Sequence, residues 1–160
     1  MTTIRDVGVV IVAAGSSTRT ASPSGELKQF RWVAGKPMLL HSLQAFHERA
    51  DVAMVVCVLP RAQAGDPPPW IFQCDTDRML VTPGGATRAE SVRNGLEDLP
   101  AGCRVVLVHD AARPFISQPT VDRVVAEVAA RVEAQRQVLL DHFQRVTALT
   151  DSTMFHVSPP

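Results

Sequence analysis

The sequence contains no tyrosine, and its aromatic fraction is only 5%. It also lacks an excess of either charge, because 16 basic residues balance 16 acidic ones. Proteins that bind nucleic acid or anionic membranes in general carry a strong basic excess, so we expect no nucleic acid and no membrane as a partner. A small phosphorylated ligand remains compatible with this composition, since it needs only a local cluster of cations.

Cysteines and long apolar runs are scarce as well. Three cysteines without CxxC spacing indicate neither a disulfide framework nor a zinc site. No apolar run approaches the roughly 20 residues of a transmembrane helix. The apolar run that follows Arg5 superficially resembles a secretory signal, but Asp6 abuts the run, which leads directly into a phosphate-loop pattern. We therefore expect a cytoplasmic chain.

Buried strands and amphipathic helices alternate along the chain. Short apolar runs predict strands at Val7–Ala13, Ala53–Leu59, Met79–Thr82 and Arg104–His109. Helical spacing of apolar residues predicts helices at Met38–Arg49 and, behind a capping box that begins at Thr87, at Arg88–Asp98. This alternation predicts an α/β fold, a three-layer Rossmann-like arrangement around a mostly parallel sheet.

The remaining segments are less regular. We expect a short extended piece at Phe30–Val33 and a turn at Gly35–Pro37, with Pro37 as the first residue of the helix that follows. Four prolines and a glycine predict a surface loop at Pro60–Trp70, and residues 71–79 are ambiguous. Helix is expected again from Pro119 to Thr147, with a break, before a frayed tail at Ser152–Pro160.

Three loops with chemically useful residues leave the carboxyl ends of predicted strands. They are Ala14–Lys28, Pro83–Ser91 and Asp110–Pro114. Ligands of parallel α/β sheets bind beyond these strand ends, so we expect the three loops to converge on one site.

The first two loops suit a nucleotide. Small residues and hydroxyls around Gly15 let a backbone approach phosphates, and Arg19 and Lys28 supply positive charge. This loop matches neither the Walker A nor the GxGxxG pattern, and a plain connection with solvated cations is the alternative. Gly84 and Gly85 enter a helix whose N-terminus attracts anions, and Ser91, one turn into that helix, is expected to donate a hydrogen bond to a ligand. A plain turn and a capped helix explain these residues equally well.

The third loop places a carboxylate at a strand end. Asp110 is where a triphosphate-bound Mg²⁺ finds an oxygen ligand. Arg113 either orients a phosphorylated substrate or pairs with Asp110 and braces the loop. His109 is interpreted as a packed residue at the strand end rather than as a base.

Five motifs in this order resemble the 2-C-methyl-D-erythritol 4-phosphate cytidylyltransferase family. They read AAGSSTR, LKQF, GKPMLLHSL, GGATRAESVRNGL and VHDAARPF, and they cover about Val7 to Ser117. The resemblance implies a Rossmann-like nucleotidyltransferase sheet. It implies an enzyme of isoprenoid biosynthesis that joins CTP to a polyol phosphate and releases pyrophosphate, with Mg²⁺ or another divalent cation.

The resemblance also assigns roles to residues. The CTP phosphates and ribose would be lined by Ala13, Ala14, Gly15 and Ser16. Arg19 and Lys28 would be catalytic, stabilising the charge on the attacked α-phosphorus and the leaving pyrophosphate. The cytosine end would be held by Gly85, Ala86 and Ser91. Asp110 and Ala111 would contact the ligand, with Asp110 nearest the metal, and Arg113 would face the second substrate.

The sequence departs from the family pattern in places. Leu27 stands where the family usually has proline, and Ala86 where an acidic residue is common. After about Arg131 we find no motif, neither the dimerisation arm of the homodimeric family nor the rest of the polyol-phosphate site. We therefore expect a nucleotide-binding domain at 1–131, a sheet incomplete on its C-terminal side and a divergent helical tail at 132–160. A catalytically weak or inactive CTP-binding remnant and a ribitol-5-phosphate-type cytidylyltransferase are the alternative functions.

Overall fold

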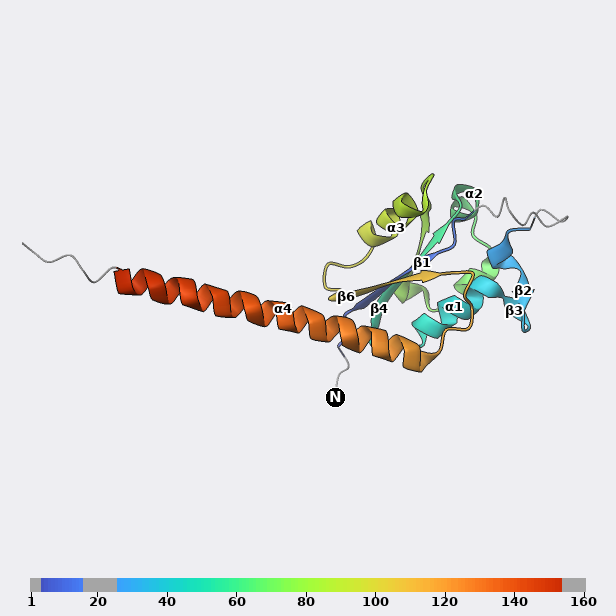
Figure 1. Cartoon of the computed structure of the whole chain (residues 1–160). Coiled ribbons are helices and arrows are strands. Elements are labelled where there is room, and N and C mark those ends of the chain that lie inside the picture. The colour runs from blue at the N-terminus through green and yellow to red at the C-terminus, as the bar shows by residue number, and fades with distance from the viewer. Residues whose placement is uncertain (1–3, 16–25, 154–160) are drawn as a thin grey trace, which may run out of the picture. The chain divides into compact units, whose positions relative to one another are not determined.

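The computed structural model describes residues 4–15 and 26–153, with side chains as far as residue 141. The chain divides into two compact units, Met1–Val121 and Asp122–Pro160, and each is described by itself. The first unit contains the sheet and its helices (Figure 1). Among the described helices, none combines the length and the apolar character needed to cross a bilayer.

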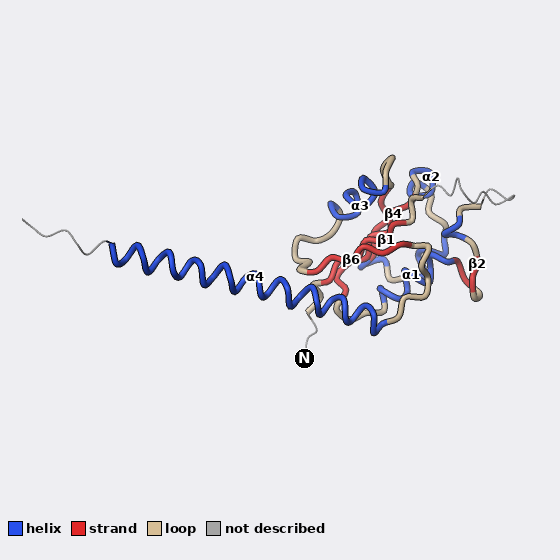
Figure 2. Tube along the Cα trace, viewed as in Figure 1, coloured by secondary structure: helices blue, strands red, loops and turns tan. Residues whose placement is uncertain are grey.

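Four parallel strands form the central sheet (Figure 2). They are β1 (Val7–Val12), β4 (Val52–Leu59), β5 (Met79–Pro83) and β6 (Val105–Asp110), in the order β5-β4-β1-β6. Strands β4 and β6 pair with β1 from opposite sides. The chain therefore adds β4 and β5 on one side of β1 and then crosses over to add β6 on the other side, which places the switch point of the sheet between the neighbouring strands β1 and β6. Ligands of open α/β sheets bind at this switch point, beyond the carboxyl ends of the strands.

Helices cover both faces of the sheet, which confirms the predicted three-layer α/β fold. Helix α3 (Arg88–Glu97) packs so closely on one face that a Cβ added to Gly95 would lie 2.5 Å from Val10 Cγ1. Helix α1 (Met38–His47) contacts β1 and β4, and its Phe46 ring meets His109 of β6 on the opposite face. The capping box predicted at the start of α3 is confirmed, because Thr87 and Glu90 each bond the other's backbone N–H.

A small hairpin precedes α1 and was only partly predicted. Strands β2 (Trp32–Val33) and β3 (Lys36–Pro37) pair antiparallel. Ala34 and Gly35 connect them with φ angles of 48° and 84°, as a two-residue hairpin turn with two positive φ angles requires. Pro37 therefore ends β3 and lies just before α1, and it is not the first residue of the helix as predicted.

The segment predicted as a surface loop, Pro60–Trp70, does lie at the surface, but it is partly helical. Helix α2 (Arg61–Gly65) begins directly after Pro60, and short 3₁₀ helices follow at η3 (Pro69–Gln73) and η4 (Thr76–Arg78). Pro60 directly precedes α2 and Pro69 opens η3, at positions where the missing N–H of proline has no helical partner to lose, whereas Asp75 caps η4.

The C-terminal helix α4 (Gln118–Thr153) is continuous, so the predicted break within it is wrong. The chain has no glycine or proline between Thr120 and Thr153 that would interrupt it. In the first unit, Gln118 Nε2 donates to the carbonyl oxygen of Ala45 at 2.7 Å, and Val121 is buried. Ser152 and Thr153, expected in a frayed tail, belong to the helix, and the rest of that tail lies outside the described residues.

Candidate active site

The three loops converge on one cavity of about 880 Å³, as predicted from their places at strand ends. Its lining includes nine residues with predicted site roles: Ala13, Ala14, Gly15, Lys28, Gly85, Ala86, Ser91, Asp110 and Ala111. Ser16 and Arg19 lie outside the described residues. A volume of this size is typical of small-ligand sites, so the cavity can hold a nucleotide.

The start of the first loop is fixed from two sides. The backbone N–H of Ala13 donates to the carbonyl of Val58 at 2.8 Å. Gln29, which is buried, donates from Nε2 to the carbonyl oxygen of Ala13 at 2.5 Å. Lys28 begins the 3₁₀ helix η2 (Lys28–Phe30) and is exposed beside the cavity. Gln29 belongs to the LKQF motif, but its role in positioning the loop becomes apparent only in the folded chain.

The second loop satisfies its own backbone groups. Glu90 Oε2 accepts from the N–H groups of Ala86 and Thr87, at 2.7 and 3.3 Å. The N–H of Gly85 donates to Ser91 Oγ at 3.1 Å. Because these amides already have acceptors, the expected attraction of an anion to this helix N-terminus is weak. The loop suits a neutral group, such as a base or a ribose, lying against Gly85.

Ser91 has one lone pair left for a ligand. Its buried hydroxyl donates to the carbonyl of Thr87 at 3.0 Å and accepts from Gly85. A hydroxyl has one donor and two acceptor positions, so its donor is already used. The prediction that Ser91 donates a hydrogen bond to a ligand therefore conflicts with the structure, in which it can only accept one.

The third loop turns tightly around Asp110. Asp110 Oδ1 accepts from the N–H of Ala112 at 3.0 Å, and its carbonyl accepts from the N–H of Arg113. The N–H of Ala111 donates to Val12, which ties the loop to β1. Within the described residues Asp110 and Arg113 form no ion pair, so the alternative in which they neutralise each other is not observed.

His109 is packed at the strand end, as expected. Its Nε2 lies 3.0 Å from the carbonyl oxygen of Arg113 and 3.3 Å from Ser42 Oγ, so the ring supports the loop from below. Burial lowers the pKa of His109 below its ordinary value of 6.5 and outweighs the carbonyl contact and the charge of Asp110, which raise it. The imidazole is therefore neutral at neutral pH.

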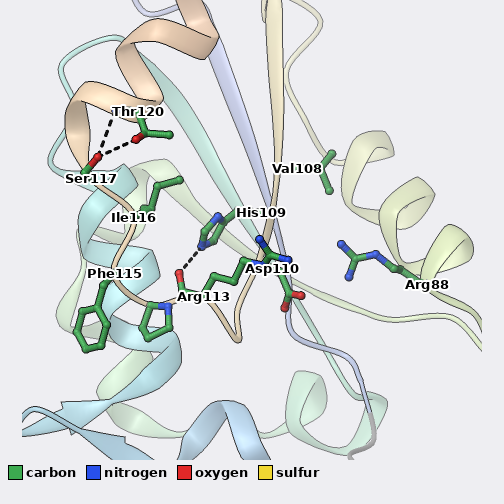
Figure 3. A pocket seen from close by; sticks show the side chains of 10 residues that line it. Arg88, Val108, His109, Asp110, Arg113, Phe115, Ile116, Ser117 and Thr120 are labelled. Carbon is green, nitrogen blue, oxygen red and sulfur yellow. Dashed lines mark hydrogen bonds between the residues drawn. The ribbon is translucent and has the colours of Figure 1, made fainter.

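A second cavity of about 690 Å³ adjoins the first (Figure 3). Arg113, predicted to face a second substrate, lines this cavity together with Phe115, Ser117 and Thr120. Arg88 and Asp110 line both cavities. No role was predicted for Arg88, because only the fold brings the start of α3 next to the end of β6.

Asp110 suits a magnesium ion that is held mainly by the phosphates of the substrate. No group of three or more His, Cys, Asp or Glu side chains gathers in the part of the chain that the structure describes. Asp110 keeps Oδ2 without a hydrogen-bond partner among those residues. Mg²⁺ is commonly bound by one or two carboxylates together with substrate phosphates, so this donor set fits that ion.

Comparison with known proteins identifies the family. The model of the 2-C-methyl-D-erythritol 4-phosphate cytidylyltransferase family matches residues 7–149, beyond the last recognisable motif. The chain is 42% identical to the bifunctional enzyme IspD/IspF of Solidesulfovibrio magneticus, over 76% of this chain and 32% of that protein. It is 37% identical to the 2-C-methyl-D-erythritol 4-phosphate cytidylyltransferase of Bacteroides fragilis, over 89% of this chain and 64% of that protein.

Solved structures agree on the fold. The 4-diphosphocytidyl-2C-methyl-D-erythritol synthase of Anaerococcus prevotii matches with a TM-score of 0.64 at 22% identity, over 78% of this chain and 51% of that one. The chain thus spans about one third to two thirds of the length of these relatives.

Proposed function

The chain belongs to the 2-C-methyl-D-erythritol 4-phosphate cytidylyltransferase family, and on this premise we propose that it transfers a cytidylyl group from CTP to 2-C-methyl-D-erythritol 4-phosphate in isoprenoid biosynthesis. The observation that carries the proposal is the convergence of the three loops on one cavity. The products are 4-diphosphocytidyl-2-C-methyl-D-erythritol and pyrophosphate.

The larger cavity is the proposed CTP site. Ala13, Ala14 and Gly15 leave room for the ribose and phosphates, and Lys28 lies at the same cavity to meet their charge. The base is proposed to lie against Gly85 and Ser91. Cytosine carries an exocyclic amino group that donates hydrogen bonds, which matches the acceptor that Ser91 Oγ still offers.

The adjoining cavity is the proposed site of the polyol phosphate. Arg113 is its cation, and Ser117 and Thr120 supply hydroxyls that suit the polyol. A phosphate oxygen of this substrate attacks the α-phosphorus of CTP and forms the new P–O bond. The bond from the α-phosphorus to the bridging oxygen breaks, and pyrophosphate leaves with the electron pair.

No strong protein base is required, because the attacking phosphate is already an anion. The residues act by positioning the two substrates and by stabilising the charge of the displacement. Lys28, with Arg19, is proposed to stabilise charge on the α-phosphorus and the leaving group. Asp110 would hold Mg²⁺, which when bound neutralises charge on the phosphates.

Pyrophosphate release tests the proposal. The purified chain is incubated with CTP, Mg²⁺ and 2-C-methyl-D-erythritol 4-phosphate, and ribitol 5-phosphate replaces the polyol phosphate in a parallel reaction. We expect release that requires all three components and that is fastest with the methylerythritol phosphate. Faster release with ribitol 5-phosphate would show that this polyol phosphate is the preferred substrate. No release in either reaction would overturn the proposal that this chain is an active transferase.

Calorimetry with CTP and Mg²⁺ separates binding from turnover. Binding without release would leave a nucleotide-binding protein. Absence of both would remove the proposed nucleotide site as well.

A further inference from the structure

Arg88 occupies the boundary between the two cavities. Of the residues that the structure describes, only Arg88 and Asp110 belong to both cavity linings. Figure 3 shows the Arg88 guanidinium extending from α3 toward Asp110 and Arg113, which come from the other side of the space. If one substrate fills each cavity, the atoms that react must meet at the residues common to both.

Within the part of the chain that the structure describes, the fold makes no use of the charge of Arg88. Among the side chains that the structure describes, Arg88 has no hydrogen-bond or ion-pair partner. Arg93, one and a half turns further along the same helix, contrasts with it because its Nε lies 3.9 Å from Glu97 Oε1. An unpaired and exposed guanidinium is available to a ligand.

The position of Arg88 in its helix also requires an explanation. Arg88 is the first residue of α3, where the helix dipole disfavours a positive charge. A guanidinium has no hydrogen-bond acceptor, so Arg88 cannot cap the N–H groups at the start of the helix, and the loop amides beside it donate to Glu90 and Ser91 instead. Its charge therefore brings no visible benefit to the folded chain without an anion in the adjoining space.

We propose that Arg88 is a catalytic residue that binds the phosphate of the second substrate at the point where this phosphate meets the α-phosphate of CTP. The inference rests on the proposed function. With Arg113 it places two guanidinium groups on opposite sides of the incoming phosphate, and a planar guanidinium can donate two hydrogen bonds to such a group. Two phosphates that approach each other repel, and the Arg88 charge lowers this repulsion during the attack.

Steady-state kinetics of Arg88→Ala and Arg88→Lys test the proposal, with Arg93→Ala as a matched control on the same helix. We expect Arg88→Ala to lower kcat/KM for the polyol phosphate by about 10- to 100-fold, the value of a lost charge-assisted hydrogen bond. The lysine variant keeps the charge but not the fork, so its loss is smaller. The dissociation constant of CTP and the melting temperature stay near those of the unchanged chain, as they do for Arg93→Ala.

Two results would overturn this role of Arg88. One is a kcat/KM for the polyol phosphate that is the same in Arg88→Ala as in Arg93→Ala. The other is a loss of CTP affinity in Arg88→Ala as large as its loss of kcat/KM for the polyol phosphate. If the unchanged chain binds CTP without turnover, the test is the calorimetric affinity of the CTP-loaded chain for the polyol phosphate. The same affinity for the polyol phosphate in Arg88→Ala and in the unchanged chain would refute the inference. Absence of CTP binding to the unchanged chain would instead overturn the proposed function, and this inference with it.

Discussion

Gly84 lies where the first and second loops of the site touch. A Cβ added to Gly84 would lie 2.3 Å from Ala14 Cβ and 3.0 Å from Ser91 Oγ. Carbon atoms in contact prefer about 3.5–4.0 Å, so Gly84→Ala forces a displacement of roughly 1 Å. Both neighbours belong to the proposed CTP site.

The surrounding bonds limit how the strain is relieved. The N–H of Gly84 donates to the carbonyl of Leu59 at 2.7 Å, which holds this residue against β4. Ala14 follows Ala13, which is fixed by Val58 and Gln29. Overpacking of this kind costs about 1–3 kcal/mol of folding free energy. The melting temperature should therefore fall by roughly 2–4 °C for each kcal/mol in a chain of this size.

The effect on function should exceed the effect on stability. A misplacement of about 1 Å in a binding site costs on the order of 100-fold in rate. We expect kcat/KM for CTP to fall by about this factor in Gly84→Ala at a temperature where the variant is folded. The control is Gly102→Ala, because no atom of the described residues other than its two chain neighbours lies within 4 Å of a Cβ added there, and both properties should be unchanged.

A double variant provides the refutation. Ala14→Gly removes the atom that the new methyl group meets, so Gly84→Ala combined with Ala14→Gly should regain most of the lost kcat/KM. The contact between the new methyl group and Ser91 Oγ remains, so recovery is incomplete. A double variant no better than Gly84→Ala, or a single variant with unchanged kinetics, would show that the two loops do not meet as described.

Four further outcomes are expected. Lys28→Ala should reduce pyrophosphate release by at least about 100-fold while CTP affinity in calorimetry falls much less, since the charge acts mainly in the transition state; equal losses would contradict this role. Gln29→Ala should weaken CTP binding about tenfold, because the loop carbonyl that it holds loses its buried partner; unchanged affinity would refute the positioning role. Asp110→Asn should raise the Mg²⁺ concentration needed for half-maximal activity, and an unchanged Mg²⁺ titration would remove this residue as a ligand. Burial raises the pKa of Cys57 to about 12, so at pH 8 iodoacetamide should alkylate it far more slowly than Cys103, as mass spectrometry of the folded chain would measure, and equal rates would contradict the buried position.

The sheet was predictable because its strands are continuous apolar runs. Val7–Val12 and Val52–Leu59 contain little besides valine and other apolar residues, and both are buried in the structure. Their carboxyl ends carry the loops with small and charged residues, and the parallel order brings these loops together. The location of the site thus follows from strand type and loop chemistry alone.

The short elements were less predictable, since tertiary packing decides them. Pro60–Trp70 has the composition of a proline-rich loop and the pattern of residues 71–79 is ambiguous, yet Ile71 is fully buried and a 3₁₀ helix forms around it. The hairpin β2–β3 requires positive φ at Ala34, a conformation that the residue type does not indicate. Local composition describes such segments poorly because their conformation depends on distant partners.

The hydrogen-bond partners of the site residues could not be predicted from the sequence either. Ser91 was expected to donate to a ligand, but its proton is committed to the carbonyl of Thr87. Gln29 and Arg88 owe their places in the site to residues far away in the chain. Hydrogen-bond partners and shared cavities are properties of the folded chain, so they cannot be predicted from the spacing of residues in the sequence.

Backbone amide NMR tests the central claim, the convergence of three loops on one CTP site, most directly. The ¹⁵N-labelled chain is titrated with CTP and Mg²⁺, and amide chemical shifts are followed. We predict that the amides of residues 13–15, 85–87 and 110–112 shift together with a single dissociation constant, while those of the β2–β3 hairpin stay unchanged. Shifts confined to one of these loops, or no shifts at all, would contradict the account.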